Sequence, residues 1–487
     1  MKQQEVWSFF NTVDRNQLAQ GLIHTDDRVR TLTAQKISVI RDATLIPDLI
    51  QALAREESGR IRYELVVALQ KIGDASIQPL FDALKSADED YRYAGALGLN
   101  GLGSAEVIRA LCIASEDPAP DVRMVAINSL GNTHTLTEEI EAKILRCLSD
   151  DDSDVLDTAI LASGKLGCCA AVPQLLSLID GEDSTSYRWR CIVRVLGELG
   201  DPNAVENLCT MLKISDENTD DCFGIRDGNL EADIIQSLGQ IGDSRAVAPI
   251  IQMLVRSFSN QSENQEKCDP DIMDTSRDRF GRKARMRRSI SNALSLIGES
   301  SIVPLIETLQ TYAVMENENK SMRGYRTHLS VTREVSKILS KMDHSVVGPI
   351  LKLLEDKNAA VRKAAVDCLS ETDLEEKTVR DALITLIFNE EDGEVKRKIS
   401  WLLRKGGLSS FDDLVNACEK MDRPFTQGEI DAIHGICQTS LSNITSNLAD
   451  PDGEERQKRL TLLRELVSVG FTLSPRRDSE GLDALFG

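Results

Sequence analysis

One phrase recurs along this chain roughly every 31 residues. It consists of an acidic turn, a Val-Arg-like pair, an alanine-rich apolar stretch and a closing glycine. The Val-Arg-like pairs are Val29-Arg30, Ile61-Arg62, Tyr91-Arg92, Val122-Arg123, Tyr187-Arg188, Val361-Arg362 and Val395-Lys396. Repetition at this period constrains the fold more than any single residue, because it predicts an array of similar units in which each unit packs only on its neighbours.

The unit from Leu45 to Asp74 shows what each repeat should form. Apolar residues recur at steps of three and four, first at Leu45, Ile46, Leu49, Ile50 and Leu53 and then at Ile61, Leu65, Ala68, Leu69 and Ile72. This spacing predicts two amphipathic helices separated by a polar turn. Gly73 should end the second helix, since glycine tolerates a left-handed backbone.

A helical pair of this size cannot bury both of its apolar faces alone, so neighbouring pairs must stack. We therefore predict an all-α fold, an α-solenoid superhelix of stacked helical hairpins with a right-handed twist. The expected organisation is an N-terminal cap over 1–20, a repeat array over 21–405, a helical C-terminal cap over 406–473 and a tail over 474–487. Polar segments near 213–229 and 256–288 interrupt the phrase and are predicted to be loop insertions.

Two segments connect the phrase to a known family. The stretch from Asp117 to Gly131, and the turn from Leu199 to Val205, resemble the short HEAT repeat of the subclass named after phycobilisome lyases. The resemblance covers roughly residues 20–405. It implies stacked helical pairs whose second helices line the concave face of the solenoid.

Composition narrows the possible partners. The chain has 57 basic and 78 acidic residues and a net charge of −21, which repels a phosphate backbone and makes nucleic acid an unlikely partner. Its start lacks a secretory signal, and no uninterrupted apolar run approaches the length of a membrane span. We therefore expect a cytoplasmic protein with no membrane insertion.

The sequence offers little for catalysis. The five histidines lie far apart, and the 11 cysteines include no Cys-x-x-Cys pair, which argues against metal sites of the usual spacing. Neither a phosphate-binding loop, a dinucleotide fingerprint nor a nucleophile elbow is present. We predict no enzyme activity, no cofactor and no metal, and we expect most cysteines to be buried free thiols.

Seven basic residues end the second insertion: Arg277, Arg279, Arg282, Lys283, Arg285, Arg287 and Arg288. They would suit a phosphate or an acidic partner. Arg285 to Arg288 also stand where other units begin their second helix, so we favour a solvated helix start over a binding site.

The position after each Val-Arg-like pair should point away from the core, about 200 degrees from the inward residue. In the N-terminal half it is occupied by large apolar residues, namely Tyr63, Tyr93, Met124 and Trp189. Such groups are enriched in protein interfaces. We interpret them as a candidate protein-binding column, with burial under neighbouring turns as the alternative.

The chain ends in a polar stretch followed by an apolar tip, in which Leu482, Leu485 and Phe486 would share one face of a helix. This tip resembles the Glu-Ile-Asp-Ala-Leu-Leu peptide by which flagellar switch proteins bind the chemotaxis response regulator. We therefore predict that these three residues dock a protein.

Three hypotheses follow. The first is a non-catalytic protein-binding scaffold or adaptor acting through the solenoid surface, with a protein partner that the sequence does not name. The second is the same scaffold serving as a taxis adaptor through its C-terminal tail. The third follows from the family resemblance and is attachment of a bilin chromophore to an antenna protein, for which Cys168-Cys169 is the pair to consider.

Overall fold

The protein is described by a computed structural model. The structure describes residues 14–182, 186–217, 230–259, 275–319, 330–369, 372–405 and Asp413. This part of the chain is all-α, as predicted, and consists of helices joined by turns and short 3-10 segments. It divides into two compact units: unit 1 comprises 1–246 and 277–293, and unit 2 comprises 247–276 and 294–487.

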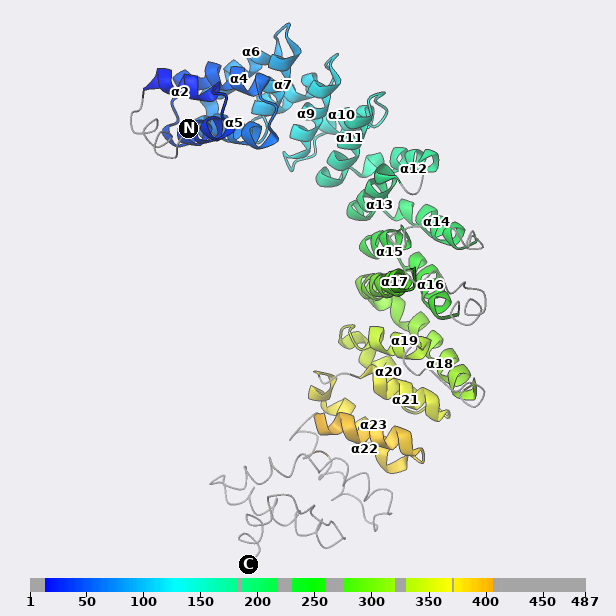
Figure 1. Ribbon diagram of the computed structural model, residues 1–487. Helices are drawn as coiled ribbons and strands as arrows, with labels where there is room; N and C mark the ends of the chain where they lie inside the picture. Colours follow the sequence, from blue (N-terminus) through cyan, green and yellow to red (C-terminus); the bar gives the residue numbers. More distant parts are fainter. Residues whose placement is uncertain are drawn as a thin grey trace, which may run out of the picture. The chain divides into compact units, whose positions relative to one another are not determined.

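Unit 1 is built from helical hairpins in two layers (Figure 1). The first helices of the hairpins are α2 (Arg15–Leu22), α4 (Ile46–Arg55), α6 (Ile77–Leu84), α8 (Ala105–Ala114), α10 (Glu138–Cys147), α12 (Val172–Gly181) and α14 (Val205–Glu217). The second helices are α3 (Asp27–Ile40), α5 (Gly59–Ile72), α7 (Glu89–Gly98), α9 (Pro120–Gly131), α11 (Ser153–Leu166), α13 (Tyr187–Leu199) and α15 (Leu230–Ile241). Each second helix packs on the next one along the chain, so the fold is an α-solenoid.

Unit 2 repeats the same plan. Its first helices are α16 (Val247–Ser259), α18 (Ile302–Asn319), α20 (Val347–Leu353) and α22 (Lys377–Asn389), and its second helices are α19 (Val331–Leu339), α21 (Ala359–Cys368) and α23 (Gly393–Lys405). Within the unit, α19 packs on α21 and α21 packs on α23. The predicted C-terminal cap over 406–473 and the tail over 474–487 lie outside the described residues, apart from Asp413.

The predicted unit from Leu45 to Asp74 matches α4 and α5. Ile46, Leu49, Ile50 and Leu53 are buried on α4, and Ile61, Leu65, Ala68 and Leu69 are buried on α5. Gly73 has a φ of 79 degrees and its N–H donates to Leu69 O, which ends α5 in the expected manner.

Neighbouring second helices approach closely because small residues face each other. A Cβ added to Gly239 on α15 would lie 2.5 Å from Ala293 Cα, within unit 1. Any side chain at Gly239 would push the two helices apart. The alanine and glycine content of the repeats thus sets the spacing of the stack.

One insertion differs from the sequence prediction. The segment 256–288 was expected to be a loop, but α17 (Thr275–Ile297) begins 13 residues before its end. The six arginines and one lysine between Arg277 and Arg288 are good helix formers, which outweighs the missing apolar periodicity. Arg287 is buried, so at least this member of the basic cluster is part of the packed structure rather than a free phosphate ligand.

Within the described residues, the segment Ala284–Glu318 is long and apolar enough, by length and composition only, to cross a membrane. It comprises the end of α17, the 3-10 segment η6 (Gly298–Ser301) and α18. Its apolar residues Ile290, Leu294, Leu305 and Leu309 are buried inside the protein. Leu296, Val303 and Met315 of the same segment are exposed, and 44% of its most apolar window is buried inside the protein.

Candidate functional site

The arginine of the repeated phrase links successive repeats. On α7, Nε and Nη2 of Arg92 donate to the two carboxylate oxygens of Asp117, at 2.8 and 3.0 Å. Its Nη1 donates to Ser86 O and Ala87 O in the turn before α7, each at 3.1 Å. Asp117 lies in the turn before α9, and its Oδ1 also accepts the N–H of Ala119 at 2.9 Å. We call this arrangement of arginine, preceding turn and following carboxylate an arginine rung.

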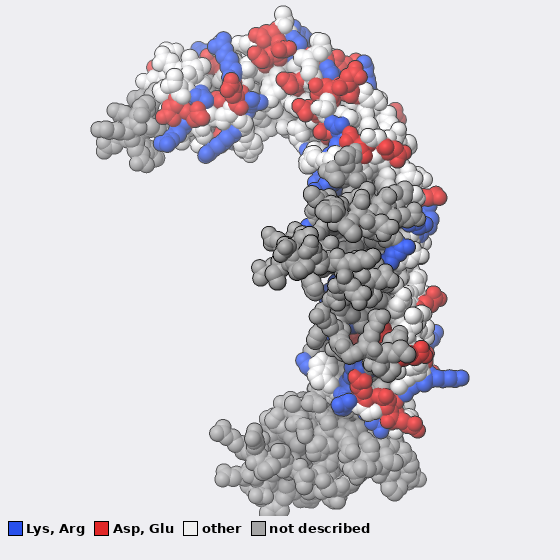
Figure 2. All heavy atoms as spheres, turned by 45° about the vertical axis from the view of Figure 1, so that its right-hand side comes forward, with Lys and Arg blue, Asp and Glu red and all other residues white. Residues whose placement is uncertain are grey.

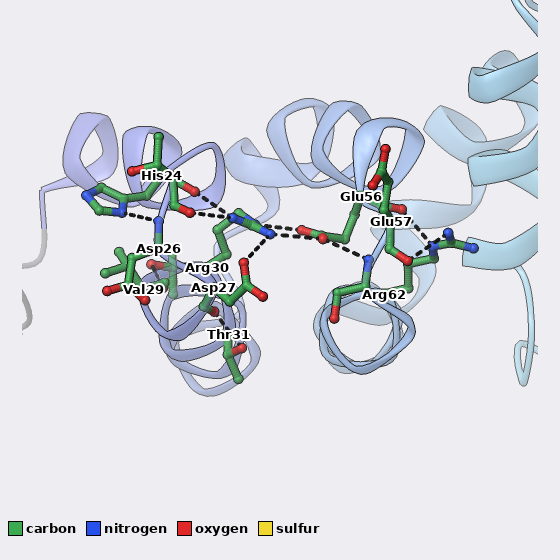
Figure 3. A network of polar contacts seen from close by, with 12 residues as sticks. His24, Asp26, Asp27, Val29, Arg30, Thr31, Glu56, Glu57 and Arg62 are labelled. Carbon is green, nitrogen blue, oxygen red and sulfur yellow. Dashed lines mark hydrogen bonds and ion pairs between the residues drawn. The ribbon is translucent and has the colours of Figure 1, made fainter.

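The rung recurs in both units. On second helices, its other members have partners 26 to 28 residues apart and include Arg30 with Glu56, Arg123 with Asp150 and Arg362 with Glu390. Arg380 on the first helix α22 makes the same kind of bonds, to Leu374 O, Glu375 O and the Asp413 carboxylate. Figure 3 shows the rung of Arg30, in which the guanidinium lies between His24 O and the Glu56 carboxylate. The arginine and carboxylate side chains of these rungs are mostly buried, with exposed fractions of 18% or less. The phrase that identified the repeats therefore marks their mutual packing.

The rung carboxylates Glu56, Asp150 and Glu390 have lowered pKa values. Hydrogen bonds from Arg123 and from the Asp152 N–H hold the pKa of Asp150 below its ordinary 3.8, despite partial burial. Burial raises the pKa of Glu56, but the hydrogen bonds from Arg30 and the Ser58 N–H outweigh it and bring the pKa below 4.5. These carboxylates are thus charged at neutral pH and stabilise the stack in that form.

One rung lacks its carboxylate. Arg62 on α5 should pair with the turn before α7, but Ser86 stands there, and its Oγ accepts the Asp88 N–H at 3.1 Å as the carboxylates do elsewhere. The Arg62 guanidinium instead donates to Glu56 O, Glu57 O and the Tyr93 hydroxyl, at 2.7, 3.1 and 2.8 Å (Figure 3 shows the two carbonyl bonds). It also lies 5.6 Å from the centre of the Tyr93 ring.

The predicted protein-binding column is only partly exposed. Tyr63 on α5 is 67% exposed and points to solvent. Tyr93 and Met124 are half-buried, and the hydroxyl of Tyr93 is held by Arg62. Trp189 is 4% exposed, so the structure corrects this member: it belongs to the core.

The error at Trp189 is a shift of one residue in the repeat register. Tyr63 lies ten residues before Gly73, and Asp157 lies ten before Gly167; both glycines end their helices with positive φ. Counting back ten from the equivalent Gly200 gives Arg190. Arg190 is the more exposed residue there and pairs with Asp233 at 3.3 Å. The Tyr187-Arg188 pair imitates Tyr91-Arg92 in type but does not occupy the same positions.

Acidic residues border the remaining column. Asp90, Asp121 and Asp154 are exposed in the first turns of α7, α9 and α11. In unit 2 the equivalent positions of adjacent helices touch, because Lys363 pairs with Glu394. In the repeated phrase of unit 1, these positions are occupied by Tyr63, Tyr93 and Met124 and by Asp90, Asp121 and Asp154. Figure 2 shows acidic side chains gathered over the upper part of unit 1.

Such a surface can contact a partner through apolar and basic side chains, because aromatic faces and carboxylates both attract cations.

The cysteines show no sign of activation. Cys112, Cys147, Cys168, Cys191, Cys209 and Cys368 are buried, and among the described cysteines Cys169 is the exposed one. Burial raises the pKa of Cys112 and Cys147 to about 11 and that of Cys368 to about 12. These thiols are therefore protonated at neutral pH and are poor nucleophiles. In the described part of the chain, no group of three or more His, Cys, Asp or Glu side chains could hold a metal ion.

Family models match much of the repeat array. A model described as HEAT repeats matches residues 16–100 and 108–192, and one described as HEAT repeat matches 346–371. A third, described as PBS lyase HEAT-like repeat, matches 232–256. The predicted resemblance is thereby confirmed. No curated protein is significantly similar in sequence.

Solved structures with a similar course of the chain include those of Kap121p and importin beta. Kap121p is 13% identical, with 96% of this chain and 51% of that chain covered and a TM-score of 0.46. Importin beta is 12% identical, with 93% and 69% covered and a TM-score of 0.48. The chain thus spans about half the length of Kap121p.

Proposed function

Because the chain is a HEAT-repeat protein that includes the phycobilisome-lyase type of repeat, we propose that it is a non-catalytic scaffold that binds a protein partner. The proposed surface is formed by Tyr63, Tyr93 and Met124 on the second helices of unit 1, with Asp90, Asp121 and Asp154 at its edge. The observation that carries this proposal is the 67% exposure of Tyr63, a large aromatic residue on a helix whose other apolar face is fully used in packing.

The stiffness of the stack supports this role. Arginine rungs join α3 to α5 and α7 to α9, and the bond from Arg62 to the Tyr93 hydroxyl joins α5 to α7, so the exposed side chains of α5, α7 and α9 lie on a preformed surface. A preformed surface loses less conformational entropy on binding than a flexible one. The bound partner should contribute arginine or lysine side chains next to apolar ones, since the edge of the surface is acidic.

The experiment compares proteins recovered from the protein's own cells with wild type and with two variants. The Tyr63→Ala, Met124→Ala double variant should lose its specific partner, with recovery reduced roughly tenfold or more. Ile113→Ala is the matched control, because Ile113 is 75% exposed on α8 in the other helix layer. Circular dichroism melting checks that both variants fold. If the double variant retains every protein that wild type recovers, the proposed surface is wrong.

The two other hypotheses stay predictions. The taxis role depends on Leu482, Leu485 and Phe486, which lie outside the described residues. For chromophore attachment, Cys168 is buried and burial raises the pKa of its thiol, while Cys169 is exposed and bonds weakly to Leu199 O. Nothing among the described residues favours either role over a scaffold.

A further inference from the structure

A second exposed surface lies in unit 2, on the last described second helix. Along α23, Glu394 is followed three and four residues later by Arg397 and Lys398, then by Trp401 and by Lys405, so these side chains share one face. The opposite side carries Val395, Ile399, Leu402 and Leu403, which are buried. These four residues form the buried apolar face of α23. Packing of α23 therefore does not account for a tryptophan on its outer face.

Two ion pairs hold this face against α21. Lys398 pairs with Asp367, and Lys363 pairs with Glu394. Together with Arg362 and Glu390, whose Nε and Oε2 lie 2.6 Å apart, they fix α21 and α23 in one arrangement. An open depression of about 480 Å³ lies over the pairs and is lined by Asp367, Glu394, Arg397, Lys398 and Trp401.

Trp401 forms one wall of this depression and is 55% exposed. The ammonium group of Lys405 lies 5.4 Å from the centre of its ring. A cation on one side of the indole leaves the remaining ring surface for a partner's apolar group, and tryptophan is the residue type that contributes most often to binding hot spots. The depression therefore has an apolar wall with cations around it.

The charge of this face is opposite to that of the whole chain. Lys363, Arg397, Lys398 and Lys405 outnumber Asp367 and Glu394, whereas the complete protein has a net charge of −21. The two carboxylates are already paired with Lys398 and Lys363. A local excess of positive charge on an acidic protein attracts an acidic ligand to this one face.

We propose that the Trp401 face of α23 is a docking site for an acidic peptide segment that carries an aromatic or large aliphatic residue. The apolar residue stacks on the indole of Trp401, and a neighbouring carboxylate pairs with Arg397. This partner differs in charge from the partner proposed for unit 1. The inference goes beyond the proposed function and stands on different residues.

An acidic peptide fits this face better than a nucleic acid does. Asp367 and Glu394 line the same depression and repel phosphates, but they can accept peptide N–H groups. The charge of the rest of the protein also opposes a long phosphate backbone, while a short acidic peptide meets only the local field.

The test uses fluorescently labelled copolymers and the full-length protein. Anisotropy should show binding of a random Glu-Tyr copolymer, weaker binding of polyglutamate of equal length, and weakening of both with added salt. Trp401→Ala should lower the affinity for the Glu-Tyr copolymer roughly tenfold, and Trp401→Phe should restore part of it. Arg397→Glu should lower it by a similar factor.

Matched controls come from unit 1. Tyr63→Ala removes an exposed aromatic residue and Arg60→Glu reverses an exposed arginine on α5, so each matches one Trp401-face variant in chemistry. Neither should change copolymer binding. Equal losses in Tyr63→Ala and Trp401→Ala would overturn the proposed site, and so would copolymer binding that none of the variants changes.

Other occupants give distinct results. Tighter binding of a single-stranded oligonucleotide than of the Glu-Tyr copolymer, lost in Trp401→Ala, would overturn the peptide and identify a nucleic-acid site. Light scattering tests whether the protein dimerises with rising concentration. Dimerisation that is lost in Trp401→Ala would overturn the peptide and identify a second copy of this chain as the occupant of the site. Loss of the cellular partner in the Tyr63→Ala, Met124→Ala variant is independent of all these outcomes, so the two proposals can fail separately.

Discussion

The α7–α9 and α5–α7 contacts of unit 1 are built on the same plan and differ in one group. Between α7 and α9, Arg92 meets a carboxylate, Asp117, which also caps the following helix. Between α5 and α7, Ser86 keeps the capping bond but offers Arg62 no charge, and Arg62 binds Tyr93 instead. The comparison separates two roles that the carboxylate combines elsewhere: ending a turn and holding the previous repeat.

The difference also bears on the proposed surface. Where Arg92 has its carboxylate, Met124, which follows the arginine of the next repeat, takes no part in the rung. Where the rung lacks its carboxylate, Tyr93 is recruited and its hydroxyl is occupied. A substitution at Ser86 that changes the bonds of Arg62 therefore also changes the surroundings of Tyr93, a member of the protein-binding column.

The largest effect is expected from breaking the complete contact. Asp117→Ala leaves Arg92, whose side chain is only 14% exposed, without its carboxylate and removes the acceptor of the Ala119 N–H. We expect a loss of about 3 kcal/mol of stability. Urea unfolding together with hydrogen exchange of the α7 and α9 amides measures it. Asp90→Ala, an exposed residue of the same helix, should change stability by no more than about 0.5 kcal/mol; equal effects would contradict the rung.

Acid tests whether the charge of the rung stabilises it. The pKa of Asp150 is lowered below 3.8 in the folded protein, so its contribution is complete above that pH and is lost as the pH falls through the folded value. Asp150→Asn should cost about 2 kcal/mol at neutral pH and progressively less below about pH 4. Thermal melting of both proteins from pH 7 to pH 3 provides the comparison. A pH-independent gap would show that geometry, not charge, is what the variant removes.

Completing the incomplete rung should stabilise the protein. Ser86→Asp places a carboxylate where Arg62 can reach it and keeps the cap on the Asp88 N–H, with an expected gain of about 1 kcal/mol. Ala87→Asp adds the same charge to the neighbouring exposed position and should bring no gain. Chemical unfolding of the two variants decides between a specific pair and a general effect of charge.

The smallest effect concerns Tyr93. Removing its hydroxyl in Tyr93→Phe should cost about 0.7 kcal/mol in the wild type, because Arg62 loses an acceptor. In the Ser86→Asp background the cost should approach zero, since Arg62 then has its carboxylate. A double-mutant cycle measures this coupling. Additive effects would mean that Arg62 does not exchange the hydroxyl for the carboxylate.

The arginine rungs had a signal in the sequence that periodicity alone did not reveal. Six residues before the arginine of several phrases stands the group that caps the turn: Glu56, Ser86, Asp117 and Asp356. The arginine's partner is the same group in the next repeat, 25 to 28 residues away. Within one repeat the sequence shows a capping residue and an arginine. The ion pair is not visible there, because the arginine's partner is the capping residue of the next repeat.

The binding column was harder to predict, for a related reason. Tyr63 was placed correctly because α5 has an unambiguous apolar stripe. Trp189 was misplaced because the Tyr187-Arg188 pair resembles Tyr91-Arg92 in residue type but lies one residue too early relative to the closing Gly200. The positive-φ glycine at the end of the helix proved a better reference than the Val-Arg pair at its start.

By itself the sequence determined that this chain forms helical hairpins that stack as an α-solenoid. That information is local, because apolar spacing, turn residues and terminal glycines act within one repeat of about 31 residues. Only the tertiary structure decided which side chains remain on the surface and which are held by the next repeat. The Tyr93 hydroxyl accepts a hydrogen bond from Arg62, Trp189 is buried and Trp401 is exposed. In each case the result depends on a neighbouring helix, whose position is not determined by the sequence of a single repeat.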